Sequence, residues 1–301
     1  MNFRKIISYF LLFSFIIVLL NDCRTLQNLF RKPKVCLVLS VGGDKGISHI
    51  GGIDALKERN IQIDCIFGNS MGSVIGSLYA TAPNENLRER YGKFIAEYIK
   101  KTEKEIKGGF LTGFLIGLGA MLVTGGTLGW ETMLGSLGAG AITSSFHEKF
   151  DNDRFKRVMN EYYKNITVDK TIIPFATEYQ YLKGQGLEMH IATTENLAEA
   201  VSRSANNPFI FKGAKLTYID PGGDRAASVP IEETCLHYNP TKIIALNVTG
   251  AKAYYSEKMN CDVEEIMINL KESSPEAIKG TGKEFEKNYK IGYETVKKHI
   301  K

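Results

Sequence analysis

The stretch GNSMG at positions 68–72 constrains the fold of this chain more than any other. It follows an apolar run, residues 61–67, typical of a buried strand, and it opens a run of small and apolar residues, 72–80, that predicts a helix. A G-x-S-x-G turn between a strand and a helix is a nucleophile elbow. Its glycines permit the tight turn, and the helix N-terminus favours negative charge beside the serine. The motif therefore predicts that Ser70 is a nucleophile rather than a small packing residue.

A similar strand, turn and helix precede this elbow. Residues 35–39 form a continuous apolar run typical of a buried parallel strand, residues 41–46 are rich in glycine, and residues 47–57 have helical spacing. The free N–H groups of such a turn can bind a phosphate or stabilise an oxyanion. The chain lacks a complete G-x-x-x-x-G-K-[ST] or G-x-G-x-x-G motif, which argues against a nucleotide site. Because adjacent strand–helix turns meet at one sheet edge, we expect an oxyanion hole beside Ser70.

The order of these motifs resembles the opening of the patatin-like phospholipase family. That family begins with a strand, a G-G-G-x-[KR]-G loop, a helix often containing H-I-G, a second strand and G-x-S-x-G. The matching residues here are 41–46, 49–51 and 68–72, with Val41 in place of the first glycine. The resemblance implies a three-layer α/β domain over residues 35–301, in which a central, mostly parallel sheet is flanked by helices.

A serine hydroxyl needs a base, because it is a poor nucleophile at neutral pH. The patatin-like family uses a Ser–Asp dyad, with the aspartate in a D-G-[GA] motif at the end of a strand. Residues 216–220 read as a strand that ends at Asp220, although Pro221 interrupts the motif. Proline fixes φ and removes an N–H group, so it could alter the orientation of the carboxylate. Asp224 is the alternative base.

The resemblance implies a role for each site residue and a reaction. The catalytic pair is Ser70 and Asp220, the oxyanion donors are Gly42 and Gly43, the loop is supported by Lys45 and Gly46, and the elbow glycines are Gly68 and Gly72. The implied activity is that of a serine carboxylic-ester hydrolase acting on a phospholipid or another acyl-ester lipid, without a metal or organic cofactor. The competing hypothesis is an inactive lipoprotein of this fold that binds membranes or lipids.

A Ser-His-Asp triad must also be considered. An α/β-hydrolase has the chain order serine, acid, histidine, which Asp220 followed by His237 or His299 would satisfy. However, the elbow comes only two strands into the domain and directly after the glycine loop, which favours the dyad. His49 lies inside the first predicted helix, where we expect a structural role.

The N-terminus predicts export. A basic n-region precedes an apolar run over residues 6–20, which together predict a signal peptide over residues 1–22. Cys23 follows directly, which resembles a bacterial lipoprotein signal whose cysteine is acylated, and residues 23–34 would then form a tether. An ordinary cleaved signal and an uncleaved anchor are the alternatives. The expected location is a bacterial membrane, in the periplasm or at the cell surface, with the membrane as a partner.

Composition excludes several classes of protein. Cys36 and Cys65 lie in apolar runs, where they are expected to be buried small apolar residues, and no C-x-x-C pair or His/Cys cluster indicates a zinc or redox site. The net charge of +5 comes from scattered lysines without interleaved aromatics, so we expect no nucleic-acid partner. The sequence leaves the oligomeric state open. Residues 254–301 read as polar and helical.

Residues 108–146 form an apolar, glycine-rich insert whose only ionisable side chain is that of Glu131. Three structures fit this composition: a flap near the active site that dips into lipid, a buried helical hairpin, and a transmembrane helix. The stretch is long enough to span a bilayer, but its dense glycines disfavour a stable spanning helix. The flap is the interpretation that we adopt.

Overall fold

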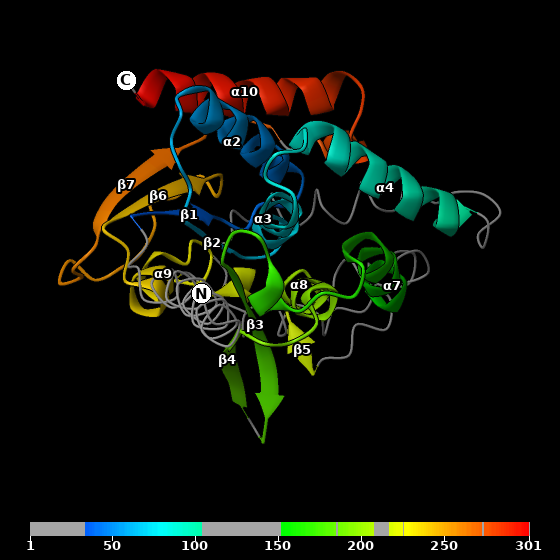
Figure 1. Cartoon of the computed structure of the whole chain (residues 1–301), viewed down its shortest axis with the longest axis horizontal. Coiled ribbons are helices and arrows are strands. Elements are labelled where there is room, and N and C mark those ends of the chain that lie inside the picture. The colour runs from blue at the N-terminus through cyan, green and yellow to red at the C-terminus, as the bar shows by residue number, and fades with distance from the viewer. Residues whose placement is uncertain are drawn as a thin grey trace, which may run out of the picture. The chain divides into compact units, whose positions relative to one another are not determined.

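The computed structural model describes residues 34–103, 152–184, 186–207, 217–224, 226–272 and 274–300. These residues form a mixed, mostly parallel sheet with the strand order β4-β3-β2-β1-β6-β7, and β5 pairs with β3 outside that order (Figure 1). Only β4 and β5 are antiparallel to their neighbour. The strands are β1 (Val35–Leu39), β2 (Cys65–Gly68), β3 (Phe175–Lys183), β4 (Gly186–Ala192), β5 (Tyr218–Ile219), β6 (Lys242–Asn247) and β7 (Asp262–Met267).

Helices cover both faces of this sheet. They are α2 (Ser48–Glu58), α3 (Met71–Thr81), α4 (Leu87–Glu103), α7 (Asn152–Tyr163), α8 (Leu197–Ser204), α9 (Ile231–Tyr238) and α10 (Lys283–His299). Leu37 and Leu39 of β1 belong to one core with the apolar residues of every helix except α9, whereas Val38 packs with α9. Successive side chains of a strand point to opposite faces, so the predicted three-layer arrangement is confirmed.

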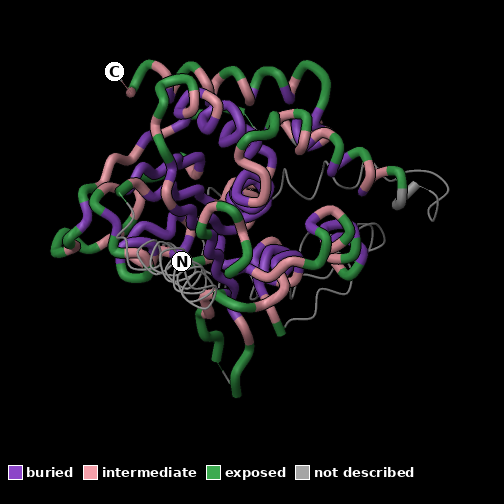
Figure 2. Tube along the Cα trace, viewed as in Figure 1, coloured by how far each residue is buried: buried purple, intermediate pink, exposed green. Residues whose placement is uncertain are grey.

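The central strands are buried on both faces, as is usual for parallel strands enclosed by helices. Residues 36–39 of β1 and all of β2 are buried, and Figure 2 shows that the buried residues gather in these strands and in α3. Exposed residues lie on the outer side of α10 and at the outer end of the β3–β4 hairpin. The apolar runs of the sequence therefore mark the central strands correctly.

The C-terminal region contains a strand that the sequence did not predict. Residues 254–301 were expected to be helical, but β7 pairs in parallel with β6 along its whole length before α10 begins. β7 lies at the edge of the sheet, and it is mostly half-buried. Because three of its six residues are acidic, it lacks the apolar run that identifies the central strands.

The described cysteines are paired as two disulfides. Cys36 and Cys65 are fully buried, as expected, but they are bonded to each other rather than separate apolar residues. They stand opposite each other in the parallel register of β1 and β2, with their Cα atoms 4.6 Å apart. Cys235 of α9 is bonded to Cys261, directly before β7. The sequence gives no strand register, so it did not identify these pairs.

Three predicted segments lie outside the described residues. These are the signal peptide over 1–22, the tether with Cys23 except for its last residue, and the insert over 108–146. Among the helices that the structure describes, none has both the length and the apolar content needed to cross a membrane.

Candidate active site

Ser70 occupies a strained turn between β2 and α3. Its φ of 52° and ψ of −123° are rare for a residue with a side chain. A Cβ atom at Gly68 would collide with the Gly72 carbonyl, and one at Gly72 would collide with the Leu39 carbonyl, so both positions admit only glycine. A strained residue held by close packing is typical of functional sites. The turn therefore has the strained conformation expected of the predicted elbow.

The sheet topology brings Ser70 and Asp220 together. β2 pairs with the first residues of β3, and β5 pairs with residues 180 and 181 on the same edge of β3 but in the opposite direction. The carboxyl ends of β2 and β5 therefore point toward each other. Ser70 follows β2, Asp220 follows β5, and Ser70 Oγ lies 2.6 Å from Asp220 Oδ2 in a hydrogen bond.

Both carboxylate oxygens of Asp220 and its backbone N–H are hydrogen-bonded. Its Oδ1 accepts a hydrogen bond from the Gly222 N–H at 2.8 Å, and its own N–H donates to the Asn206 carbonyl. Burial raises the pKa of Asp220 to about 6, although the hydrogen bonds from Ser70 and Gly222 oppose this rise. Pro221 is the first residue of a short 3-10 helix (Pro221–Gly223), a position where the missing N–H costs nothing. The proline is therefore compatible with this placement of the carboxylate.

The end of α8 contacts both members of the pair. Ser204 Oγ accepts a hydrogen bond from the Ser70 N–H at 3.1 Å, and the Asn206 carbonyl accepts from the Asp220 N–H at 3.1 Å. The Asn206 side chain also donates to the carbonyl of Tyr218, two residues before Asp220. One turn of chain thus fixes the backbones of Ser70 and Asp220 relative to each other.

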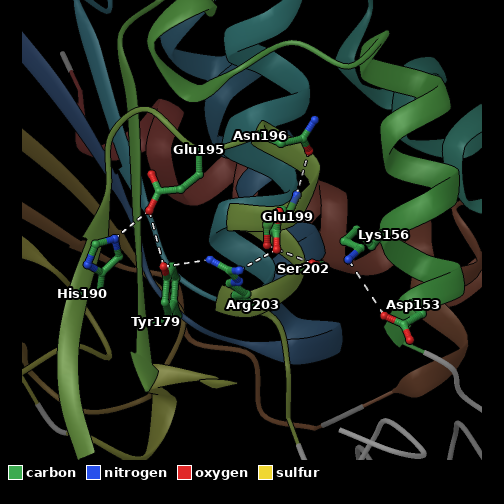
Figure 3. Close-up of polar contacts among 9 residues, drawn as sticks. All are labelled: Asp153, Lys156, Tyr179, His190, Glu195, Asn196, Glu199, Ser202 and Arg203. Atoms are coloured by element: carbon green, nitrogen blue, oxygen red, sulfur yellow. Dashed lines mark hydrogen bonds and ion pairs between the residues drawn. The ribbon is translucent and has the colours of Figure 1, made fainter. Parts of the chain in front are cut away.

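A polar network fixes α8 against the β3–β4 hairpin. Figure 3 shows Arg203 of α8 reaching the Tyr179 hydroxyl on β3, with an ion pair to Glu199 one turn earlier. The Tyr179 hydroxyl also donates a hydrogen bond to Glu195, whose carboxylate is hydrogen-bonded to His190 of β4 at 2.6 Å. These contacts hold the helix whose C-terminal end carries Ser204.

The glycine loop packs against the elbow. A Cβ atom at Gly46 would crowd the Met71 side chain, so the loop and the first residue of α3 are in close contact. Gly43 has a φ of 51° and begins a 3-10 helix (Gly43–Ile47) in which the Lys45 N–H donates to the Gly42 carbonyl. Among the described residues, no backbone carbonyl accepts from the N–H of Gly42 or Gly43.

Val41 has a structural role in this loop. Its N–H donates to the Ser228 carbonyl at 2.9 Å, which ties the glycine loop to the segment that follows Asp220. The residue that departs from the G-G-G pattern is therefore not one of the two predicted oxyanion donors, Gly42 and Gly43.

The structure does not bring the alternative bases to Ser70. His49 is buried, its Nε2 donates to the Ser40 carbonyl at 3.0 Å, and burial lowers its pKa to about 4. His237 packs on the Phe67 and Tyr238 rings, and His299 faces Glu264. Within the described part of the chain, neither Ser70 nor Asp220 has a hydrogen bond to a histidine.

Asp224, the alternative base, makes its hydrogen bonds within its own turn. It is exposed, and its Oδ1 accepts from the N–H groups of Ala226 and Ala227, which makes it a turn-forming residue. No group of three His, Cys, Asp or Glu side chains in the described ranges is arranged to hold a metal ion.

Sequence reasoning missed two buried residues beside the pair, Asn69 and Glu178. The Asn69 side chain donates to Glu178 Oε2 at 2.8 Å and to the Ala227 carbonyl at 2.8 Å. The available signal was an acidic residue inside the aromatic strand that contains Phe175, where a charge would be costly.

Comparisons with known proteins agree on one family. The chain is 42% identical over 73 residues to lysophospholipase NTE1 of Debaryomyces hansenii, which covers 24% of this chain and 5% of that protein. It is 38% identical over 65 residues (22% and 5%) to a patatin-like phospholipase domain-containing protein of Caenorhabditis elegans. The chain therefore spans about a twentieth of these relatives.

VipD from Legionella pneumophila is a solved structure with a TM-score of 0.40 and 14% identity, covering 89% of this chain and 67% of that one. The model of the patatin-like phospholipase family matches residues 37–234, well over half of the sequence. The chain thus belongs to the patatin-like phospholipase family.

Proposed function

We propose that this chain is a serine ester hydrolase that releases fatty acid from phospholipids or lysophospholipids. The observation that carries the proposal is the hydrogen bond of 2.6 Å between Ser70 Oγ and buried Asp220 in a member of this family. The names of its relatives support a lipid ester as the substrate, lysophospholipids in particular.

The geometry supports a two-step mechanism. Asp220 accepts the proton of Ser70 as Oγ attacks the acyl carbonyl, and the N–H groups of Gly42 and Gly43 donate to the oxyanion. The ester C–O bond then breaks, and Asp220 returns the proton to the departing alcohol. Water attacks the acyl-enzyme in the second step, Asp220 takes the proton of that water, and fatty acid leaves as Oγ is reprotonated.

Fatty-acid release from phospholipid and lysophospholipid micelles by the full chain tests this function. We expect time-dependent release and covalent labelling of Ser70 by a fluorophosphonate, located by mass spectrometry. A folded protein that binds lipid vesicles but releases no fatty acid and takes no label would instead be the lipid-binding protein of the competing hypothesis.

The rate should depend on the ionisation of Asp220. The base must be ionised, and its pKa is raised to about 6, so kcat/KM is expected to fall about tenfold per pH unit below 6 and to level off above it. The pH profile of kcat/KM on a soluble short-chain ester measures this. A rate that does not change with pH between 4 and 8 would contradict Asp220 as the base.

We also propose that the protein is exported and acts at a membrane surface. Its two disulfides are typical of oxidising compartments. The β3–β4 hairpin continues past the carboxyl end of β2, where Ser70 lies, and one face of it exposes Leu182, Leu187 and Met189. This apolar face supports contact with lipid near the site.

Acylation of Cys23 is the part of this proposal that a substitution can test. Cys23→Ala is expected to lose incorporation of radiolabelled palmitate in bacterial cells and to move the protein from the membrane fraction to the soluble fraction. The Thr25→Ala variant, which changes a neighbouring residue and leaves Cys23 in place, is the matched control and should keep the label. Equal labelling of Cys23→Ala and the unchanged protein would contradict acylation at this position.

A further inference from the structure

The edge of β3 has an opening between its two partners. β2 pairs with Phe175 and Ala176, and β5 begins to pair at Gln180, which leaves the Glu178 N–H on that edge without a strand carbonyl. The Asn69 side chain fills this opening, and its Oδ1 accepts from the Glu178 N–H at 3.0 Å. Asn69 thus replaces a strand residue at the point where the ends of β2 and β5 converge.

The other end of the same amide holds the base segment. Asn69 Nδ2 donates both to Glu178 Oε2 and to the Ala227 carbonyl, each at 2.8 Å. Asn69 immediately precedes Ser70, and Ala227 belongs to the segment that begins at Asp220. One fully buried side chain therefore connects the elbow, β3 and the segment that carries the base.

We propose that Asn69 and Glu178 are a positioning pair that sets Ser70 against Asp220 during ester hydrolysis. The inference rests on the proposed function, because positioning has meaning only if the pair reacts. Neither residue is placed to touch the reacting atoms. Their effect is on the distance and orientation across the 2.6 Å hydrogen bond of the dyad.

The protonation state of Glu178 should determine whether the hydrogen bond from Asn69 Nδ2 to Glu178 Oε2 is kept. Glu178 is 1% exposed, and its Oε1 is buried without a partner among the described residues. Burial, together with the charges of Glu233 on α9 and Asp224 in the base segment, raises the pKa of Glu178 to about 8, and the hydrogen bond from Asn69 opposes this rise. At neutral pH Glu178 is therefore the uncharged acid, and Oε2 accepts from Asn69 in that form.

Ionisation of Glu178 would place a charge in the core beside two other carboxylates. A buried charge is stabilised when water reaches it, so the ionised Glu178 side chain is expected to move toward solvent and away from Asn69. This movement would loosen both the elbow and the segment that contains Ala227. We therefore expect the rate of hydrolysis to fall as pH rises above 8. This alkaline limb of the pH–rate profile is separate from the acid limb that Asp220 produces.

The test compares Glu178→Gln with the unchanged full chain. Glutamine has the shape of the neutral acid and its carbonyl can accept from Asn69, so kcat at pH 7 should stay within about twofold. The alkaline limb of kcat should disappear. Glu178→Ala removes the acceptor of Asn69 Nδ2 and keeps only the backbone N–H bond to Asn69 Oδ1, so it should lower kcat about tenfold or more at every pH with KM nearly unchanged.

Glu233→Gln is the matched control. It removes one neighbouring charge without touching Asn69, so the alkaline limb should remain but move to lower pH. An alkaline limb in Glu178→Gln at the same pH as in the unchanged chain, or full kcat in Glu178→Ala, would overturn the positioning pair. Absence of hydrolysis in the unchanged chain at every pH would instead refute the proposed function.

Denaturant unfolding gives a second readout that does not need activity. The folded pKa of Glu178 lies above its ordinary value of 4.5, so its contribution to stability is present below pH 4.5 and is lost as pH rises to about 8. The denaturation midpoint of Glu178→Gln should therefore exceed that of the unchanged chain by a gap that widens up to pH 8 and is constant above it. A gap that is independent of pH would show that Glu178 is ionised in the folded protein and would overturn the inference.

Discussion

Asp220→Asn is expected to slow ester hydrolysis by about 10²–10⁴-fold, the contribution of a general base. The same change should raise the free energy of unfolding by about 3 kcal/mol at pH 8. The stabilisation follows from the raised pKa, since a shift of about two units corresponds to about 3 kcal/mol spent on ionising a buried carboxyl. Asparagine keeps the neighbouring contacts, because its oxygen can accept from the Gly222 N–H and its NH₂ group can donate to Ser70 Oγ.

The sign of this effect depends on pH. A carboxyl whose pKa is raised in the folded state contributes its full stability below its ordinary pKa of 3.8 and loses it as pH rises through about 6. The two proteins should therefore unfold at similar denaturant concentrations near pH 4, and the variant should be more stable from pH 7 upward. A variant that is no more stable at pH 8 than the unchanged chain would contradict a buried, ionised Asp220.

Ser70→Ala is the matched control for this experiment. It should be at least as inactive, but it removes the hydrogen bond that favours the ionised form of Asp220. The pKa of Asp220 then rises further, and the variant should be less stable than the unchanged chain at pH 8. If both variants are inactive while Asp220→Asn is more stable and Ser70→Ala less stable, the loss of activity cannot be explained by a loss of stability. The role of Asp220 as a base is then distinguished from the free energy that its burial costs.

Local sequence patterns were sufficient to place the two turns of the site. The apolar runs before Gly42 and Gly68 are true strands, and the helices after them begin within a few residues of the expected positions. Such patterns succeed here because a buried parallel strand needs apolar side chains on both faces. A strand that ends at Asp220 was also predicted, and β5 (Tyr218–Ile219) ends directly before it, although this strand is short and antiparallel.

Features that depend on strand pairing could not be predicted in this way. β5 has only two residues, and its convergence with β2 exists because both pair with the same edge of β3. The positioning role of Asn69 depends on that convergence, and the disulfide between Cys36 and Cys65 depends on the register of β1 and β2. β7 was missed because its pattern is set by its place at the sheet edge.

Gly42→Ala is expected to reduce kcat/KM by about 10²–10³-fold, the cost of losing one oxyanion donor. The φ of Gly42 is 176°, outside the left-handed region that favours glycine, and its ψ is −1°. The added methyl group would instead collide with Val248 Cγ2, and the loop must move to relieve the collision. Proline at Gly43 is a poorer probe, because the φ of 51° there is far from the value that proline imposes.

Val248→Ala removes the side chain that the methyl group at position 42 would strike, so it tests whether the effect of Gly42→Ala can be reversed. Val248 is buried directly after β6, and removing its Cγ atoms takes away the closest contact of the methyl group at position 42, leaving the Gly46 N atom at 3.0 Å as the nearest. The double variant Gly42→Ala/Val248→Ala should therefore recover most of the lost kcat/KM, whereas Val248→Ala alone should mainly lower stability, by about 1–2 kcal/mol. Recovery would show that the position of the loop, rather than the chemical identity of residue 42, determines the rate. If Gly42→Ala instead keeps the full kcat/KM while folded, the loop does not supply the donors, and the oxyanion must be stabilised elsewhere, for example by the N–H of Met71, directly after Ser70.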